Sequence, residues 1–515
     1  MKRLQMIENW ALWLCVATFP FIMLPHKLSI PGLGGNLPML FILLAIITLG
    51  MEALCYHTVE FPYKRFLIFY SGWVGLTIII GAIQFPYYHE ISIGVLQDSS
   101  FGKFVIHLLG YMDECWILSI GLFSTFFWRG IRDLVFLPIG IFLLIYHLYG
   151  KNWQHGFNCI LQAVRMISVL CCVYSSIEIF WLWTGNSGCE NLLKYINVWL
   201  YDPEQANGWW PPLLWYGQAR SVFQEPSFLG IGEIFLLPFL WYSTICKRRK
   251  LDITLFLCLL LMLFMTNART ALVIYGLELL ALVFLGMILH YPHWKRYTVY
   301  ILLISLCMFG VNILANNIVN PLYNKIIQDM GYSYDQDVKK DKLISASEYV
   351  AKNITSVTGI QERSNAQRYG NIVAMVNVGM MFPVFGVGFG YESKYMENQF
   401  PAWSQDNPEV KLWTSEIEKK GILKAGYPFL NQYTATFMRE GVIGILLFLF
   451  APFYIFYQVY KQRKNLYDFR AVCILIVVWG QMVCMLSNSV FITYFIGLSL
   501  LACFAFNQRK GDKDN

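Results

Sequence analysis

The sequence predicts an all-α, polytopic integral membrane protein with about twelve or thirteen transmembrane helices and one large outward-facing loop domain. The chain has 515 residues, of which 57% are hydrophobic, 17% aromatic and only 14% charged, and its mean hydropathy is +0.49. Soluble domains carry about 25% charged residues. Apolar runs long enough to cross about 30 Å of hydrocarbon recur along the whole chain. The composition therefore excludes a soluble protein.

The candidate spans are apolar runs of about 17–25 residues, the length that a helix needs to cross a bilayer. They lie near residues 8–25, 38–56, 66–85, 104–127, 133–149, 157–184, 226–245, 252–267, 270–289, 297–315, 436–460, 470–486 and 489–506. We expect one run in the first half to be re-entrant or to lie in the interface. The chain then divides into N-terminal helices (1–184), an outer loop (185–225), central helices (226–315), a large and partly helical outer loop domain (316–435), and C-terminal helices with a cytoplasmic tail (436–515).

The basic residues of the second half predict its orientation. They gather at Lys247–Lys250, Lys295-Arg296, Lys461–Lys464 and Arg509–Lys513, whereas Ser487–Ser489 carries none. Short loops rich in lysine and arginine stay in the cytoplasm, so the C-terminus is expected there.

The first half gives a conflicting signal, because basic residues fall in three successive predicted loops, near positions 64, 130 and 151. These loops cannot all face the cytoplasm. We expect the N-terminus to be inside, as Lys2 and Arg3 indicate, with one of the stretches 133–149 and 157–184 not crossing fully.

The loop domain at 316–435 contains 12 Lys and Arg and 12 Asp and Glu residues. Long segments cross membranes largely regardless of charge, so its outside location depends on the flanking helices. Within it, Asp335–Lys352 is compatible with a short surface helix or with a mobile loop, and both interpretations stay open.

Composition also argues against several kinds of partner. The 13 cysteines are scattered, mostly inside apolar runs, and form no CxxC pair. The net charge of +7 is spread over short loops. We therefore expect no disulfide frame, no metal site, no cofactor and no nucleic-acid partner.

The first candidate site is the segment RSVFQEPS, in which Arg220 and Glu225 precede Pro226 at the start of an apolar helix. Charges at a membrane face are costly, so a site that keeps them is a functional candidate. The structural alternative is that Glu225 caps the helix and Arg220 pairs with it.

A second arginine, in Asn267-Ala268-Arg269-Thr270, separates two short apolar runs near the outer face. Its planar guanidinium suits a phosphate or a carboxylate. A lipid-headgroup anchor is the alternative.

Two further segments lie in and after the outer domain. Arg368 opens a helix-like stretch that ends in a GxGxG run with Gly386 and Gly388, which permits close approach by a ligand or by another helix. Asn431 begins the last segment, in which Arg439 and Glu440 are expected to pair with each other. In the first half, Asp113-Glu114 stands inside an apolar run, and we assign no chemistry to it.

Taken together, these segments resemble the family of bacterial O-antigen polymerases (Wzy) and O-antigen ligases. The matching motifs are Arg220…Glu225-Pro226, Asn267-Ala-Arg269-Thr270, Arg368…Pro383-Val-Phe-Gly386-Val-Gly388-Phe-Gly390 and Glu440-Gly441-Val-Ile-Gly444. They occur in the family's order over about residues 215–460.

The resemblance implies a metal-independent glycosyltransferase of the bacterial inner membrane that polymerises undecaprenyl-diphosphate-linked glycan repeats on the periplasmic face. Expected partners are these lipid-linked glycans, membrane lipids and a chain-length regulator protein. The expected catalytic residues are Arg220, Glu225 and Arg269. The expected substrate-binding residues are Arg368, Asn431, Tyr433, Gly386 and Gly388.

One departure favours the polymerase branch over the ligase branch. Ligases that resemble this family carry a His-Asn pair before the E-x-G helix, but this chain has Leu430-Asn431 there and no histidine after His293. The alternatives are an O-antigen ligase and a flippase of lipid-linked glycans. A glycosyltransferase that uses single-sugar polyprenyl phosphates is disfavoured, because loop 26–37 has no Asp or Glu.

Overall fold

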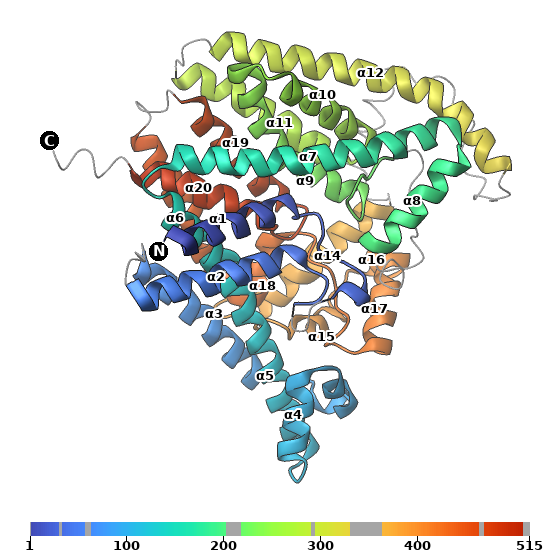
Figure 1. Cartoon of the computed structure of the whole chain (residues 1–515). Coiled ribbons are helices and arrows are strands. Elements are labelled where there is room, and N and C mark those ends of the chain that lie inside the picture. The colour runs from blue at the N-terminus through green and yellow to red at the C-terminus, as the bar shows by residue number, and fades with distance from the viewer. Residues whose placement is uncertain are drawn as a thin grey trace.

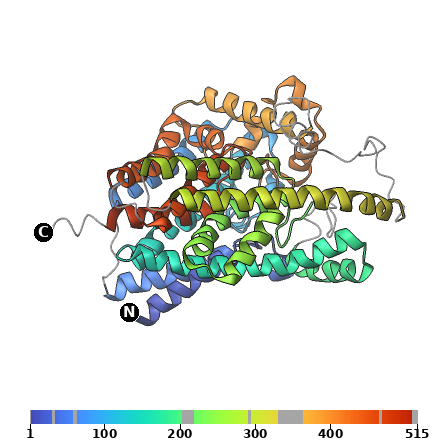
Figure 2. The same ribbon diagram turned by 90° about the horizontal axis from the view of Figure 1, so that it is seen from above.

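The computed structural model describes residues 2–29, 33–56, 63–201, 218–289, 294–329, 363–462 and 468–507. Long helices run side by side in a bundle, and the shorter helices of the outer loop domain gather at one end of it (Figure 1). The start of the first helix and the end of the last lie together at the opposite end (Figures 1 and 2).

The described residues of the first half form eight α-helices. They are α1 (Lys2–Ala17), α2 (Leu37–Tyr56), α3 (Lys64–Gln84), α4 (Ser100–Leu109), α5 (Glu114–Leu134), α6 (Ile141–Tyr149), α7 (Trp153–Thr184) and α8 (Ser187–Leu200). Three short 3-10 helices, η1 (His26–Leu28), η2 (Tyr88–Glu90) and η3 (Ile93–Asp98), and a π-helical turn, η4 (Val135–Gly140), join them.

The second half holds the remaining central helices, the outer helices and the last three helices. They are α9 (Pro226–Tyr242), the π-helical η5 (Ser243–Lys247), α10 (Lys250–Met265), α11 (Arg269–Leu289), α12 (Trp294–Asp329), α14 (Arg363–Met381), α15 (Glu392–Met396), α16 (Ala402–Gln405), α17 (Pro408–Lys420), α18 (Gln432–Lys461), α19 (Phe469–Cys484) and α20 (Ile492–Asn507).

The expectation of an all-α polytopic membrane protein is confirmed. In the described part of the chain, eight helices are long and apolar enough to cross a membrane. They span Leu37–Tyr56, Lys64–Gln84, Glu114–Tyr149, Trp153–Leu182, Pro226–Lys247, Arg269–Ile288, Lys295–Leu314 and Gln432–Lys461. This number is below the expected twelve or thirteen, in part because α1, α10, α19 and α20 have only 16 residues each.

The first half differs from the expectation at two predicted spans. The run 104–127 is broken after α4, and 114–149 is one continuous helix that passes through the π-helical turn at Pro138. Arg129 and Arg132 therefore lie within a helix and not in a loop. The stretch 133–149 is the second part of this helix and not a separate span, and 157–184 belongs to a helix of spanning length. The expectation that one of the two stretches does not cross fully stays a prediction.

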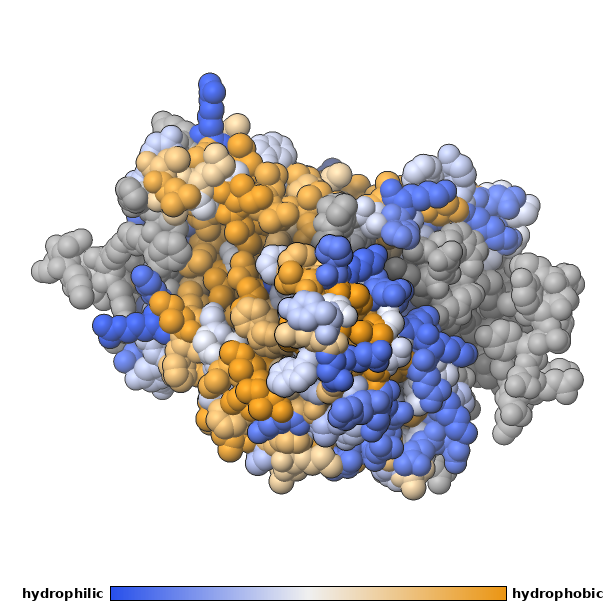
Figure 3. All heavy atoms as spheres, turned by 90° about the horizontal axis from the view of Figure 1, so that it is seen from below, coloured by the Kyte–Doolittle hydropathy of each residue, from blue (hydrophilic) through white to orange (hydrophobic). Residues whose placement is uncertain are grey.

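The surface is divided into an apolar zone and a polar zone, as expected of a membrane protein. In Figure 3 apolar side chains form a broad zone over the bundle, and hydrophilic side chains cover the end where the outer helices lie. Exposed apolar residues such as Leu54, Ile83, Leu280 and Leu306 belong to the predicted spans. A surface of this kind suits lipid contact on the sides and water at the end.

The outer loop domain shares its core with the first half of the chain. Phe85, Leu96 and Phe126 pack in one buried cluster with Val378 and Tyr391. The outer helices thus do not form a separate unit within the described structure. Their position depends on the end of α3 and on α5.

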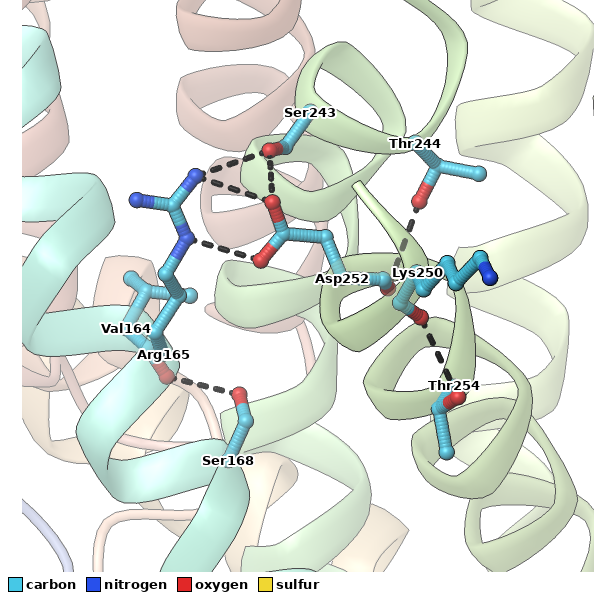
Figure 4. A network of polar contacts seen from close by, with 8 residues as sticks. All are labelled: Val164, Arg165, Ser168, Ser243, Thr244, Lys250, Asp252 and Thr254. Atoms are coloured by element: carbon cyan, nitrogen blue, oxygen red, sulfur yellow. Dashed lines mark hydrogen bonds and ion pairs between the residues drawn. The ribbon is translucent and has the colours of Figure 1, made fainter. Parts of the chain in front are cut away.

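A buried ion pair joins three helical segments of the bundle (Figure 4). The Nε atom of Arg165 in α7 donates to Oδ1 of Asp252 in α10 at 2.7 Å, and Nη2 donates to Oδ2 at 2.9 Å. Ser243 of η5 donates to the same carboxylate and accepts from Arg165 Nη2 at 2.9 Å. The two-point contact is the preferred geometry of arginine with a carboxylate.

Replacing Asp252 with alanine leaves the Arg165 guanidinium without its counter-charge, so we expect the free energy of unfolding to fall by about 3–5 kcal/mol. Thermal unfolding of the full chain in detergent micelles measures the change. The matched control is Lys250→Ala, an exposed change two residues away in α10, with an expected effect within about 0.5 kcal/mol. Equal stability of the two variants would contradict the role of the ion pair.

Candidate active site

A cluster of four charged side chains lies where four helices begin. Glu225 is the N-cap residue of α9, Arg269 is the first residue of α11, Arg368 lies in the second turn of α14, and Glu409 lies in the first turn of α17. All four are half-buried. α14 and α17 lie at the end of the bundle away from the chain termini (Figure 1). The fold therefore brings together charges that are up to 184 residues apart in the sequence.

Two hydrogen bonds orient the cluster. Arg368 Nη1 donates to Oγ1 of Thr270 at 3.1 Å, which ties α14 to the start of α11. Ser227 Oγ donates to Oε2 of Glu225 at 3.0 Å. Each bond uses only part of the polar capacity of its charged partner. Arg368 and Glu225 can therefore each form further hydrogen bonds.

The charges in the cluster influence one another. Burial raises the pKa of the Glu225 carboxyl, and the negative charge of Glu409 raises it further. The hydrogen bond from Ser227 and the positive charge of Arg368 act in the opposite direction, but the net shift is upward. Burial lowers the pKa of the Arg368 guanidinium; Glu225 and Glu409 counteract that effect, and Arg269 adds to it. Two cations and two carboxylates thus share one half-buried region.

Arg220 lies in a different environment from Glu225. Its side chain is buried, with 2% of the residue exposed. Its Cζ atom is 4.7 Å from the centre of the Tyr201 ring, Nη2 donates to the Tyr174 hydroxyl at 3.4 Å, and Nη1 donates to the carbonyl of Gln224 at 3.3 Å. No ion pair joins Arg220 to Glu225, and both residues belong to the described structure. The structural alternative of a simple Arg220–Glu225 pair was therefore wrong.

The acidic partner of the Arg220 segment is Glu178 of α7, which the sequence analysis missed. Its carboxylate accepts hydrogen bonds from the backbone amides of Arg220 at 3.3 Å and Ser221 at 3.0 Å. Ser221 adopts a positive φ of 54°, so these bonds hold a turn that the backbone alone disfavours. No motif marked Glu178, because it lies in an apolar run 42 residues before Arg220.

The GxGxG run forms a tight backbone contact between α3 and α18. Val387 N donates to the carbonyl of Met438 at 2.9 Å, and Gly388 N donates to that of Arg439 at 3.0 Å. Gly386 and Gly388 have φ values of 68° and 80°, which favour glycine. A Cβ atom on Gly386 would lie 2.3 Å from the carbonyl carbon of Arg439. Chain packing thus accounts for these glycines, while their expected contact with substrate stays a prediction.

Arg439 pairs with Glu392 and not with Glu440, so that expectation was wrong. Its Nε donates to Oε1 of Glu392 at 2.9 Å, and its Cζ lies 4.6 Å from the Phe389 ring centre and 3.9 Å from that of Phe429. Glu392 Oε2 also accepts from the amide of Gly390. The ion pair therefore fixes the end of the glycine run against α18.

Asn431 and Tyr433 join the start of α18 to the end of α19 and to the turn that follows it. Asn431 Oδ1 caps α18 by accepting from Thr434 N at 3.0 Å, and its Nδ2 donates to the carbonyl of Leu486 at 2.9 Å. The Tyr433 hydroxyl donates to the carbonyl of Met482 at 2.8 Å. These bonds give both residues a structural part, and their expected role in substrate binding stays a prediction.

Two remaining expectations have simple outcomes. Asp113 is the N-cap residue of α5 and accepts from Cys115 N at 3.1 Å, with Glu114 in the first turn. This pair therefore begins a helix and does not stand inside a span. The segment Asp335–Lys352 lies outside the described residues.

Comparison with known families agrees with the ordered motifs. Residues 254–449 match the family model Wzy_C, described as O-antigen ligase. The chain carries an O-antigen ligase family domain. No curated protein matches it. The Wzy_C domain includes Arg269, Arg368 and Glu409, whereas Arg220 and Glu225 precede it, so the charged cluster combines residues from inside and outside the matched segment.

Replacing Gly386 with alanine adds a Cβ atom that meets the α18 backbone and puts a side chain at a positive φ. We expect a loss of about 2 kcal/mol or more in the free energy of unfolding. Thermal unfolding checks this, with Gly276→Ala as control, because a Cβ atom at Gly276 meets nothing within 4 Å. If the two variants melt at the same temperature, the close contact does not contribute to stability.

Proposed function

We propose that this protein polymerises lipid-linked oligosaccharide repeats at the outer face of the bacterial inner membrane. The donor in this proposal is a glycan on undecaprenyl diphosphate, and the acceptor is a sugar hydroxyl of another lipid-linked repeat. The observation that carries the proposal is the half-buried cluster of Arg269, Arg368 and Glu225 at the polar end of a membrane bundle that contains a Wzy_C domain. The basic segments Lys247–Lys250, Lys295-Arg296 and Lys461–Lys464 support a cytoplasmic C-terminus.

The two arginines of the cluster suit the diphosphate. Arginine presents planar, permanently charged donors that match phosphate oxygens. Arg269 and Arg368 lie at the starts of α11 and α14, and Thr270 connects these two helices through its bond to Arg368. In our proposal both guanidiniums bind the diphosphate and stabilise the negative charge that grows on it as it leaves. Fixed donors of this kind commonly contribute about 3–4 kcal/mol each to the transition state.

The reaction needs one proton acceptor. The acceptor hydroxyl oxygen forms a bond to the anomeric carbon of the donor glycan, and the bond from that carbon to the diphosphate oxygen breaks, with its electron pair leaving on the diphosphate. The hydroxyl proton passes to a carboxylate. Glu225 is our choice, because its carboxyl interacts electrostatically with Arg368 and because burial raises its pKa above that of an ordinary glutamate. Arg220 is then a positioning residue, which holds the turn before Glu225.

The ligase reaction is the second candidate, since the matched family model is described as O-antigen ligase. Family ligases carry a histidine next to the residue that corresponds to Asn431. Here the neighbour is Leu430, and Asn431 itself caps α18. This difference favours the polymerase.

Replacing Arg269 or Arg368 with alanine should lower polymerisation by about 100- to 1,000-fold, because each change removes a donor to the leaving diphosphate. The assay incubates purified full-length protein with a short lipid-linked repeat and resolves the products on a gel. The unmodified protein should give a ladder of multiples.

The control for this assay is Arg296→Ala, an exposed arginine near the start of α12, which should leave the ladder unchanged. Full activity of both site variants would refute diphosphate binding by the cluster. Transfer to lipid A core in place of a ladder would establish a ligase, and transport without any product would establish a flippase.

The pH dependence of the ladder tests Glu225. A base must be deprotonated, and the raised pKa of Glu225 moves this requirement to a higher pH than for an ordinary glutamate. Activity should therefore fall as the pH drops through the raised pKa. Glu225→Gln should lower the rate by about 100- to 10,000-fold and remove this acid limb. Glu418→Gln, an exposed change in α17, should keep both the rate and the profile; an unchanged profile in Glu225→Gln would assign the base elsewhere.

A further inference from the structure

A second polar cluster lies in the first half of the bundle, apart from the proposed active site. It consists of Glu8 of α1, Glu52 of α2 and His147 of α6. These helices meet at the end of the bundle where the chain termini lie (Figure 1). Glu8 and Glu52 are completely buried, and the side chain of His147 is 7% exposed. The proposed polymerase reaction does not use this cluster.

The three side chains converge on one small volume. Nε2 of His147 is 3.4 Å from Oε1 of Glu52 and 3.8 Å from Oε2 of Glu8. One ligand atom from each residue lies within 4.8 Å of the others. Around a tetrahedral Zn²⁺ with bonds of about 2.0–2.1 Å, neighbouring ligand atoms are about 3.3–3.4 Å apart. The two distances from His147 are close to this value, and the third separation is within 4.8 Å, so a bound ion would draw the three side chains together.

The hydrogen bonding of the cluster is incomplete in a way that points to a ligand. Both carboxylate oxygens of Glu8 are buried without a hydrogen-bond partner, and so is Nε2 of His147. The imidazole nitrogen thus lies near two carboxylates without being aligned for a hydrogen bond to either. A nitrogen lone pair directed at a cation between the carboxylates has this orientation. Burying a charged carboxylate without compensation costs several kcal/mol, and a bound cation would remove that cost.

We propose that Glu8, Glu52 and His147 bind a divalent transition-metal ion, with Zn²⁺ as the best match. Two carboxylates and one neutral imidazole balance a double positive charge and supply the oxygen and nitrogen ligands that Zn²⁺ accepts. The three protein ligands leave one position of a tetrahedron for water. The bound ion would join α1, α2 and α6, three helices from different parts of the first half.

The surroundings support the cluster. Gln5 Nε2 donates to Oε1 of Glu52 at 3.1 Å, which orients that carboxylate as outer-shell partners of metal ligands do. Gln5 also lines an open cavity of about 580 Å³ together with Asn9, His155 and Cys159. The cavity therefore reaches a residue that contacts the cluster.

Metal content and stability test the proposal on the full-length protein, purified without a histidine tag. We expect about one Zn²⁺ per chain by elemental analysis. A chelator should lower the melting temperature, and added Zn²⁺ should restore it, since a ligand that binds only the folded state stabilises it. Co²⁺ added to the stripped protein should give visible absorption bands of a low-coordinate site. An unmodified protein that binds neither Zn²⁺ nor Co²⁺ would overturn the proposal.

Variants locate the site. Glu8→Gln and His147→Ala should lose the bound metal and the response to the chelator, while Gln5→Ala should weaken binding by about 10- to 100-fold. His155→Ala is the control at the same end of the bundle and should retain the metal. If His155→Ala loses the metal, or if Glu8→Gln retains it, the site is not this cluster. If the unmodified protein binds no metal and Glu8→Gln melts at a higher temperature than it does, the two carboxylates are held together by a shared proton. The proposal then fails.

Discussion

The backbone contact between residues 383–388 and the kinked turn of α18 is the constraint on which the outer part of this protein depends. α18 loses its helical geometry at Gly441, where φ is 69°, so backbone groups near this kink are available to residues 383–388. Val442 N, for example, donates to the carbonyl of Pro383 at 2.8 Å. On the other side, a Cβ atom on Gly81 of α3 would lie 2.3 Å from the Val387 carbonyl oxygen. Backbone groups that are buried between helices need hydrogen-bond partners within the protein. Side chains at the glycine positions would not fit at these distances, so the glycines permit the contact that holds residues 383–388 against α3 and α18.

Burial of charge is the second condition that shapes the bundle. Arg165 meets Asp252 in a two-point contact, and Arg439 lies between two aromatic rings while its guanidinium meets Glu392. Arg220 is held by aromatic side chains, and Glu178 accepts from the backbone beside it. In each case a charge that water would otherwise solvate is matched by a specific partner from a distant helix. These partners fix helix positions more narrowly than apolar contact alone, because a buried charge without its partner is expensive.

The proposed active site follows from these two conditions. The glycine run and the Arg439–Glu392 pair place α14 and α17 beside the starts of α9 and α11, so that Arg368 and Glu409 reach the region of Glu225 and Arg269. Because the four residues lie at helix starts at the polar end, they keep partial contact with water. Half-burial strengthens their mutual electrostatics without removing access for a substrate that is anchored in the membrane. Arg220, fully enclosed, contributes by shaping the turn that leads to Glu225.

By itself, the sequence determined the fold class, the ordered motifs of the O-antigen ligase family, and Glu225, Arg269 and Arg368 as charges of interest. Those conclusions depend on composition and local pattern, which do not require knowledge of distant contacts. Only the tertiary structure decided that Arg220 separates from Glu225, that Glu178 and Glu392 are the partners of two arginine segments, and that 114–149 is one helix through Pro138. It also brought together Glu8, Glu52 and His147, which are far apart in the sequence and match no spacing motif. The physical reason is the same in each case. In a low-dielectric bundle, a buried polar group finds its partner on whichever helix packs beside it, and local sequence patterns do not determine which helices pack together.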